Sequence, residues 1–382
     1  MNNRVGVIGC GNIAQVYLED FEKSYRRQIT VAACADIVPE KARETAEKYG
    51  VPKACTPEEL VRLPEVDIVL NLTVPAVHNS INRMALEAGK HVYCEKPLAL
   101  SLEDAKVTLD LAKKKGLRVA CAPDTILGPA IQTSRKLLDD GWIGTPFAAS
   151  TNITGWGPET WHPNPGFFYQ YGGGPLLDMG PYAVAALVNL FGPMKRMQCI
   201  ATKALDERMI YSDPRKGERI PVEVPTHYSG SAQMANGVVV GMTMSFDTWK
   251  SSLPPLEIYG TEGTLQVPHP ADFAGKIRLY RANGIIDELE GRGAVEEKDR
   301  WYEIPAILGG SVGNRRGIGV ADLAAAIRQG RPHRTGEDFI LHCTEILLSF
   351  DQAVKDGGAY EFTTVCKRPE RMPTGLEIGQ VD

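Results

Sequence analysis

The chain has 382 residues, of which 43% are hydrophobic, and its 42 basic and 47 acidic residues give a net charge of −5. This length suits two domains rather than one. The acidic balance, without a basic stripe, gives no support for nucleic acid as a partner. No apolar run approaches the roughly 18 residues of a membrane span, and the N-terminus opens on a strand without a signal-peptide pattern. We therefore expect a cytoplasmic protein with no membrane partner.

The eight cysteines are dispersed and lack the spacing of zinc ligands, so no metal is expected. Cys34, Cys94 and Cys121 fall in predicted buried strands. They are typical of small apolar fillers in a reducing compartment.

Strand and helix signals alternate through the first third of the chain. Helices are expected to begin at Pro or a capping residue and to end at Gly. The predicted strands are 4–8, 29–35, 66–73, 91–94 and 117–122, and the predicted helices are 13–26, 39–49, 76–88 and 101–115. This alternation predicts an α/β fold whose first domain, residues 1–122, is a doubly wound parallel sheet.

The pattern changes after residue 122. A helix at 131–140, a strand at 146–154 and a Gly-, Pro- and aromatic-rich loop at 155–174 precede a helix at 176–190. Strand signals then dominate at 197–204, 230–235, 238–246, 256–259, 264–267 and 277–280, before helices at 319–329 and 337–355. Residues 123–382 are therefore expected to form an α+β domain with an open, largely antiparallel sheet.

The first strand leads into the glycine turn Gly9-x-Gly11-x-x-Ala14. Gly9 permits a sharp turn, Gly11 removes a side chain where a pyrophosphate would approach, and Ala14 lets the helix pack on the strand. The pyrophosphate would rest on free N–H groups at the helix start, where Asn12 and Ile13 lie. A tight turn without a ligand is the alternative.

Asp36 follows the second strand, 22 positions after Ala14, where a ribose-binding carboxylate belongs. It would accept hydrogen bonds from both adenosine ribose hydroxyls and repel a 2′-phosphate, which favours NAD over NADP. Alternatively, Asp36 only ends the strand or caps the helix that Pro39 begins.

Two later motifs complete a pattern that resembles a known family. They are Leu72-Thr73-Val74-Pro75-x-x-His78 and Gly89-Lys90-His91-Val92-x-x-Glu95-Lys96-Pro97. With the glycine turn and Asp36, their order is similar to that of the glucose–fructose oxidoreductase/inositol dehydrogenase (Gfo/Idh/MocA) family. The resemblance implies an NAD-dependent oxidoreductase that transfers hydride between nicotinamide and a secondary alcohol of a sugar or cyclic polyol. It places Thr73, Pro75, His78, Glu95 and Lys96 beside the cofactor, and Lys96 would also polarise the substrate oxygen.

The second domain carries Gly172-Gly173-Gly174-x-x-x-Asp178-x-Gly180-x-Tyr182, in the place of the family's substrate-site motif. The resemblance makes Asp178 and Tyr182 catalytic, although many members have His in place of Tyr182. The i, i+4 spacing would put both side chains on one side of a helix. Asp178 could instead be the N-cap of a helix beginning at Gly180-Pro181, and Tyr182 a core aromatic.

Three further residues are substrate-binding candidates: Asp124 at the sheet edge, and Trp161 and His162 in the aromatic loop. A loop histidine with a purely structural role is an equal alternative for His162. Alternative functions are glycoside cleavage with a retained NAD, or a non-catalytic NAD-dependent sensor. Family members commonly pair through the second-domain sheet, so a homodimer or homotetramer is expected.

Overall fold

The computed structural model describes residues 3–291, 301–306 and 316–382, and these form two compact units. The first unit holds residues 3–128 together with 316–348 and 369–382, and the second holds the rest. A single boundary after residue 122 does not describe this division. Helix α10 (Ile318–Gln329) returns to the first unit because it packs against β6 and the short helix η3 (Asp124–Leu127).

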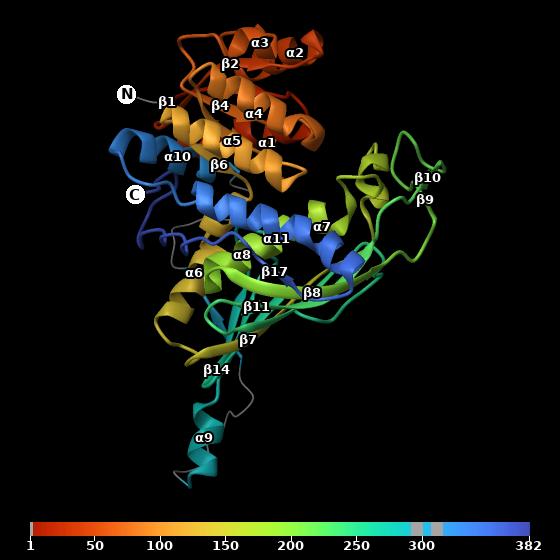
Figure 1. Ribbon diagram of the computed structural model, residues 1–382. Coiled ribbons are helices and arrows are strands. Elements are labelled where there is room, and N and C mark those ends of the chain that lie inside the picture. Colours follow the sequence, from red (N-terminus) through yellow and green to blue (C-terminus); the bar gives the residue numbers. More distant parts are fainter. Residues whose placement is uncertain (1–2, 292–300, 307–315) are drawn as a thin grey trace. The chain divides into compact units, whose positions relative to one another are not determined.

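The first unit is built on six parallel strands in the order β3-β2-β1-β4-β5-β6 (Figure 1). This confirms the predicted doubly wound parallel sheet, to which the structure adds the short strand β3. The order reverses at β1, and ligands bind at such a switch point in open α/β sheets. The strands are β1 (Asn3–Ile8), β2 (Ile29–Ala35), β3 (Ala54–Cys55), β4 (Ile68–Asn71), β5 (His91–Cys94) and β6 (Val119–Cys121).

Helices connect these strands, and α4 and α5 lie side by side (Figure 1). Helix α5 shows why the ends fall where they do: the Ser101 side chain accepts a hydrogen bond from the Asp104 N–H, and Gly116 ends the helix at φ +65°. These helices are α1 (Asn12–Asp20), η1 (Phe21–Tyr25), α2 (Pro39–Tyr49), α3 (Pro57–Leu60), η2 (Pro75–Val77), α4 (His78–Glu87) and α5 (Leu102–Lys115). The later helix α11 (Glu337–Asp356) begins in the first unit and continues past residue 348 into the second.

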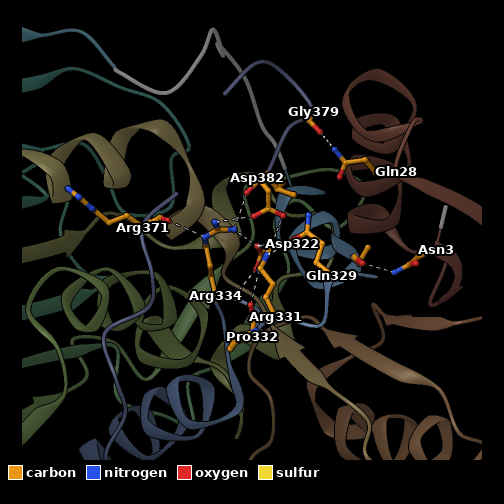
Figure 2. Close-up of polar contacts among 12 residues, drawn as sticks. Asn3, Gln28, Asp322, Gln329, Arg331, Pro332, Arg334, Arg371, Gly379 and Asp382 are labelled. Carbon is orange, nitrogen blue, oxygen red and sulfur yellow. Dashed lines mark hydrogen bonds and ion pairs between the residues drawn. The ribbon is translucent and has the colours of Figure 1, made fainter. Parts of the chain in front are cut away.

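Residues near the end of the sequence are bound to the first unit by charged groups (Figure 2). The Asp322 carboxylate, 1% exposed, pairs with both Arg331 and Arg334. The same two guanidinium groups reach the Asp382 side chain at 2.8 and 3.3 Å, and Gln28 donates to the Gly379 carbonyl. Segment 369–382 is therefore an integral part of the first unit.

The second unit contains a nine-stranded sheet in the order β16-β15-β14-β13-β7-β12-β11-β8-β17, antiparallel except for the β7–β12 pair. This confirms the predicted open, largely antiparallel sheet. Its strands are β7 (Pro146–Thr154), β8 (Met194–Thr202), β11 (His227–Met234), β12 (Val239–Ser245), β13 (Leu256–Gly260), β14 (Gly263–Val267), β15 (Ile277–Arg281), β16 (Tyr302–Ile304) and β17 (Tyr360–Glu361). A separate hairpin pairs β9 (Glu207–Met209) with β10 (Arg219–Pro221).

Helices cover one face of this sheet (Figure 1). Every residue of α8 (Gly180–Phe191) is buried, and the helix contacts both β7 and α6 (Pro129–Asp139). The helix expected at 176–190 is in fact two helices, because α7 (Gly174–Asp178) ends before α8 begins. The loop at 155–174 holds two short helices, η4 (Pro158–Thr160) and η5 (Gly166–Tyr169), and α9 (Asn283–Leu289) follows β15.

Among the described residues, no helix combines the length of a membrane span with the apolarity that such a span requires.

Candidate functional site

The glycine turn leaves room for a dinucleotide at the start of α1. Gly9 has φ +100°, and a Cβ there would lie 2.7 Å from the Leu72 carbonyl carbon, so no other residue fits without strain. A Cβ on Gly11 would meet nothing within 4 Å, and no side chain caps the helix. The N–H groups at the start of α1, at Asn12 and Ile13, therefore face open space that suits a pyrophosphate. The residues present fit NAD.

Asp36 stands directly after β2 and is half-buried. Its Oδ2 accepts a hydrogen bond from the Cys10 N–H at 2.8 Å, and its Oδ1 accepts one from the Val38 N–H at 2.9 Å. Asp36 therefore holds the glycine turn to the end of β2. Each oxygen keeps a further lone pair, which is what a ribose hydroxyl requires.

The segment after β4 holds three of the predicted cofactor residues. The Thr73 hydroxyl, half-buried, donates to Asn71 Oδ1 at 2.6 Å, and Pro75 opens η2. His78 is 1% exposed, and its two ring nitrogens face the carbonyl oxygens of Thr73 and Pro97. The His78 ring is thus engaged by the protein's own backbone rather than directed outward.

The Glu95-Lys96-Pro97 segment begins immediately after β5. Glu95 is buried: it accepts a hydrogen bond from the Tyr17 hydroxyl at 2.9 Å and one from the Lys96 backbone N–H at 2.9 Å, and Arg316 lies 3.8 Å from it. Glu95 therefore fixes the turn from inside the unit. Lys96 is partly exposed at the carboxyl edge of the sheet.

Asp124, a predicted substrate residue, is completely buried in η3. Its Oδ2 accepts the Gly319 N–H at 3.1 Å, while Oδ1 has no hydrogen-bond partner in the described residues. Burial raises the pKa of this carboxyl to about 8. Its location thus favours a role inside the first unit over contact with a substrate.

In the second unit, Asp178 and Tyr182 do not share one helix. Asp178 is the last residue of α7, and the N-cap of α8 is Met179, so the alternative of an Asp178 N-cap is wrong. The break occurs because Pro181, at the start of α8, has no N–H to continue the α7 ladder. Asp178 is partly exposed, whereas Tyr182 is 5% exposed within α8.

A cavity of about 180 Å³ in the second unit brings two of the candidates, Asp178 and Trp161, to one place. Trp156 and Phe246 add aromatic walls, and His269 adds a polar group that was not among the predicted residues. Other lining residues are Ile153, Thr154, Gly155, Pro158, Met179 and Ser245. Such a mixture of flat apolar surface and a few polar groups is typical of small-molecule sites.

His162 lies beside this cavity but is not among the residues that line it. Its ring makes edge contacts with Trp161, Phe167 and Phe168, and its Nδ1 accepts the Asn164 N–H at 3.0 Å. Burial lowers the pKa of His162, with the charge of Asp178 opposing that effect. These contacts favour the structural alternative for His162.

A buried ion cluster supports the cavity wall. Arg208, 1% exposed at its side chain, pairs with Glu159 at 2.8 Å and with Asp247. Its guanidinium also stacks 4.4 Å from the Trp156 ring and donates to the Phe246 carbonyl at 3.0 Å. The residues of this cluster come from three separate segments, and no local motif in the sequence signals it.

The parallel sheet and the open glycine turn define a dinucleotide-binding Rossmann domain, and comparison with known proteins agrees. Residues 3–122 match the model of an oxidoreductase family with an NAD-binding Rossmann fold, and residues 131–266 match the GFO/IDH/MocA C-terminal domain. The chain belongs to the glucose–fructose oxidoreductase/inositol dehydrogenase/MocA family.

Individual relatives and structures extend this result. The chain is 35% identical over 297 residues to an inositol 2-dehydrogenase/D-chiro-inositol 3-dehydrogenase of Lactiplantibacillus plantarum, covering 76% of this chain and 78% of the relative. It is 25% identical over 248 residues to a levoglucosan dehydrogenase of Pseudarthrobacter phenanthrenivorans. This match covers 60% of this chain and 63% of the relative, which is less than two thirds of its length. An NAD-binding oxidoreductase from Klebsiella pneumoniae has the same fold, with a TM-score of 0.80 at 22% identity over 96% of this chain and 99% of that one.

Proposed function

We propose that the protein is an NAD-dependent dehydrogenase that oxidises or forms a secondary alcohol on a sugar or cyclic polyol. The observation that carries this proposal is the cavity in the second unit, where aromatic walls meet the Asp178 carboxylate. Flat apolar rings suit the C–H faces of a sugar ring, and a carboxylate accepts hydrogen bonds from its hydroxyls. The names of the relatives, which include inositol and levoglucosan dehydrogenases, point to the same substrate class.

Hydride transfer from an alcohol requires the protein to bind the cofactor, to move the hydroxyl proton and to stabilise the developing alkoxide. Bound NAD supplies the hydride acceptor. We assign alkoxide stabilisation to the Lys96 ammonium and proton transfer to Tyr182, whose phenol needs a nearby cation to act at neutral pH. Asp178, which lines the cavity, is assigned to binding a substrate hydroxyl.

The deciding experiment incubates the protein with excess NAD and a panel that includes myo-inositol, D-chiro-inositol and levoglucosan. NADH formed in proportion to oxidised substrate supports the proposal. Glycoside cleavage without net NADH would replace it with cleavage through a retained cofactor. NAD binding without turnover of any compound would favour a sensor.

The assignment of Lys96 is tested by Lys96→Ala. Loss of one preorganised electrostatic contact lowers kcat by about 10²–10³-fold, and NAD affinity should stay nearly unchanged. Tyr182→Phe should lower kcat and kcat/KM together, because the hydroxyl acts chiefly in the transition state. A near-normal kcat in either variant would remove that residue from the mechanism.

We also propose a homodimer or homotetramer through the nine-stranded sheet. One face of this sheet is covered by helices, and on the other face Val239 is 49% exposed and Ile200 is 78% exposed. Ile200→Arg would place a charge on that face and should shift the protein to smaller species in light scattering. An unmodified protein that is monomeric at micromolar concentration would contradict this proposal.

A further inference from the structure

The surroundings of His78 determine its charge. His78 is the first residue of α4 and is 1% exposed. Its Nδ1 lies 2.7 Å from the Pro97 carbonyl oxygen, and its Nε2 lies 2.9 Å from the Thr73 carbonyl oxygen. A carbonyl oxygen only accepts hydrogen bonds, whereas a neutral imidazole carries a single N–H. Both contacts are satisfied only if both ring nitrogens are protonated, and the ring is then an imidazolium.

A buried cation requires a counter-ion, and Cys94 supplies the partner. Cys94 ends β5, is 0% exposed, and its sulfur lies beside the His78 ring. Despite desolvation, which acts in the opposite direction, hydrogen bonds and the imidazolium charge lower the pKa of this thiol to about 5. Desolvation acts against the charge on His78, but Cys94 and the two carbonyl oxygens outweigh it and raise the pKa of His78 to about 9.

Other side chains also lie around the pair. Asn82, one turn after His78 on α4, accepts a hydrogen bond from Asn71 with its Oδ1, and its own Nδ2 has no hydrogen-bond partner among the described residues. Cys121 on β6 also contacts that sulfur. The carboxylates nearest in sequence are engaged elsewhere: Glu95 with Tyr17, and Asp104 of α5 with Asn79.

The two carbonyl groups belong to the segments that follow neighbouring strands of the sheet. Thr73 follows β4, and Lys96-Pro97 follows β5, which pairs with β4. We propose that His78 is an imidazolium clamp that fixes the Thr73 segment and the Lys96-Pro97 segment to one another through its two ring N–H groups. His78 is then a positioning residue for Lys96, an inference that rests on the proposed role of Lys96 in hydride transfer.

The protonation state can be measured on the unmodified protein. Two-bond ¹H–¹⁵N correlation spectra distinguish an imidazolium from either neutral tautomer, and the chain has seven histidines. His78 should show two protonated nitrogens at neutral pH. His91 is the internal control, because its Nδ1 accepts the Arg118 N–H at 3.0 Å and burial lowers its pKa, so it should be neutral. A neutral His78 under these conditions would overturn the proposal, whether or not a sugar is the substrate.

The counter-ion is tested by Cys94→Ala. Without the thiolate the buried cation is less stable, so the pKa of His78 should be at least one unit lower than in the unmodified protein. One unit corresponds to about a tenfold change in the acid dissociation constant. Thiolate absorbance in the ultraviolet should decrease in the same variant. An unchanged His78 titration would show that Cys94 is not the counter-ion.

The positioning role is tested by kinetics on His78→Asn, with His91→Asn as a matched control on the same sheet. Misplacement of a catalytic group by about 1 Å lowers rates by up to about 10²-fold. We expect kcat to fall by about 10–10²-fold in His78→Asn, with KM for the alcohol nearly constant and His91→Asn close to the unmodified protein. Cys94→Ala should be active at neutral pH. As the pH is raised, this variant should lose its activity at a lower pH than the unmodified enzyme does. If His78→Asn folds and keeps its kcat, or if the pH profile of Cys94→Ala is unchanged, the clamp does not position Lys96.

Discussion

Replacing Arg208 with methionine should destabilise the second unit by about 3–5 kcal/mol, because breaking a buried ion pair leaves an uncompensated charge. The Arg208 side chain is 1% exposed, and its two partners Glu159 and Asp247 are 0% and 10% exposed. Methionine has a similar length but offers no donor to either carboxylate. Glu159 would keep the hydrogen bond that it accepts from the Tyr169 hydroxyl but would lose its cationic partner.

A matched control lies on the same β9–β10 hairpin as Arg208. Arg219 pairs with Glu207 at 3.5 Å, but these side chains are 64% and 57% exposed, so Arg219→Met should change stability by at most about 1 kcal/mol. The assay is urea unfolding followed by tryptophan fluorescence. All five tryptophans (142, 156, 161, 249 and 301) belong to the second unit, so this signal follows that unit alone.

The functional effect should follow from the same contacts. Arg208 donates to the Phe246 carbonyl and stacks on Trp156, and both of these residues line the cavity. Arg208→Met should therefore weaken substrate binding while NAD affinity, a property of the first unit, stays unchanged. Equal urea midpoints for the Arg208 and Arg219 variants would refute the reasoning, because burial would then make no difference to the ion pair.

Three further predictions concern the first unit. Gly9→Ala should lower the stability of the first unit, because the new Cβ meets the Leu72 backbone, and should lower NAD affinity by at least about tenfold. Gly11→Ala should lower NAD affinity alone, because its Cβ meets no protein atom. Calorimetric titration with NAD and thermal unfolding separate the two outcomes. Asp36→Ala should narrow the difference in affinity between NAD and NADP, and equal affinities in the unmodified protein would contradict the role of the carboxylate. Burial raises the pKa of Asp124 to about 8 from an unfolded value near 4. The protonated Asp124 carboxyl therefore contributes most to the free energy of unfolding at low pH, and this contribution is lost as the pH rises through about 8. Hydrogen exchange of the β6 amides should show this decline, by at most about 1.4 kcal/mol per pH unit, and Asp124→Asn should remove it.

Much of the fold could be predicted from local patterns. The parallel sheet followed from apolar runs separated by helices with clear ends, such as the one between Ser101 and Gly116. The division of 176–190 into two helices could not be seen from composition, because both halves are apolar and Gly180-Pro181 is also compatible with the first turn of one helix. The return of α10 to the first unit depends on long-range packing, where Gly319 approaches Tyr93 and Asp124 so closely that a Cβ would not fit.

The candidate site shows a similar limit. Glycine spacing and the carboxylate after the second strand located the turn and Asp36, because these features depend on neighbours in sequence. His269 gave no signal in the sequence, and it reaches the cavity only through the path of the chain after β14. The His78 ring was predicted to lie beside a cofactor, yet its two nitrogens face carbonyl groups from separate segments. Such contacts depend on tertiary structure and leave no motif.

The discontinuity of the first unit has a consequence for synthesis on the ribosome. Its sheet is complete once residue 128 has emerged, but α10 follows after roughly 200 more residues and segment 369–382 after roughly 250. At about 5–20 residues per second, the delay before α10 is synthesised is about 10–40 s. Through that interval β6 lacks the helix that covers it, and the second unit is the one whose segments emerge nearly together. We therefore expect the nascent Rossmann sheet to be a chaperone client and its protease resistance to appear only after segment 369–382 has been synthesised.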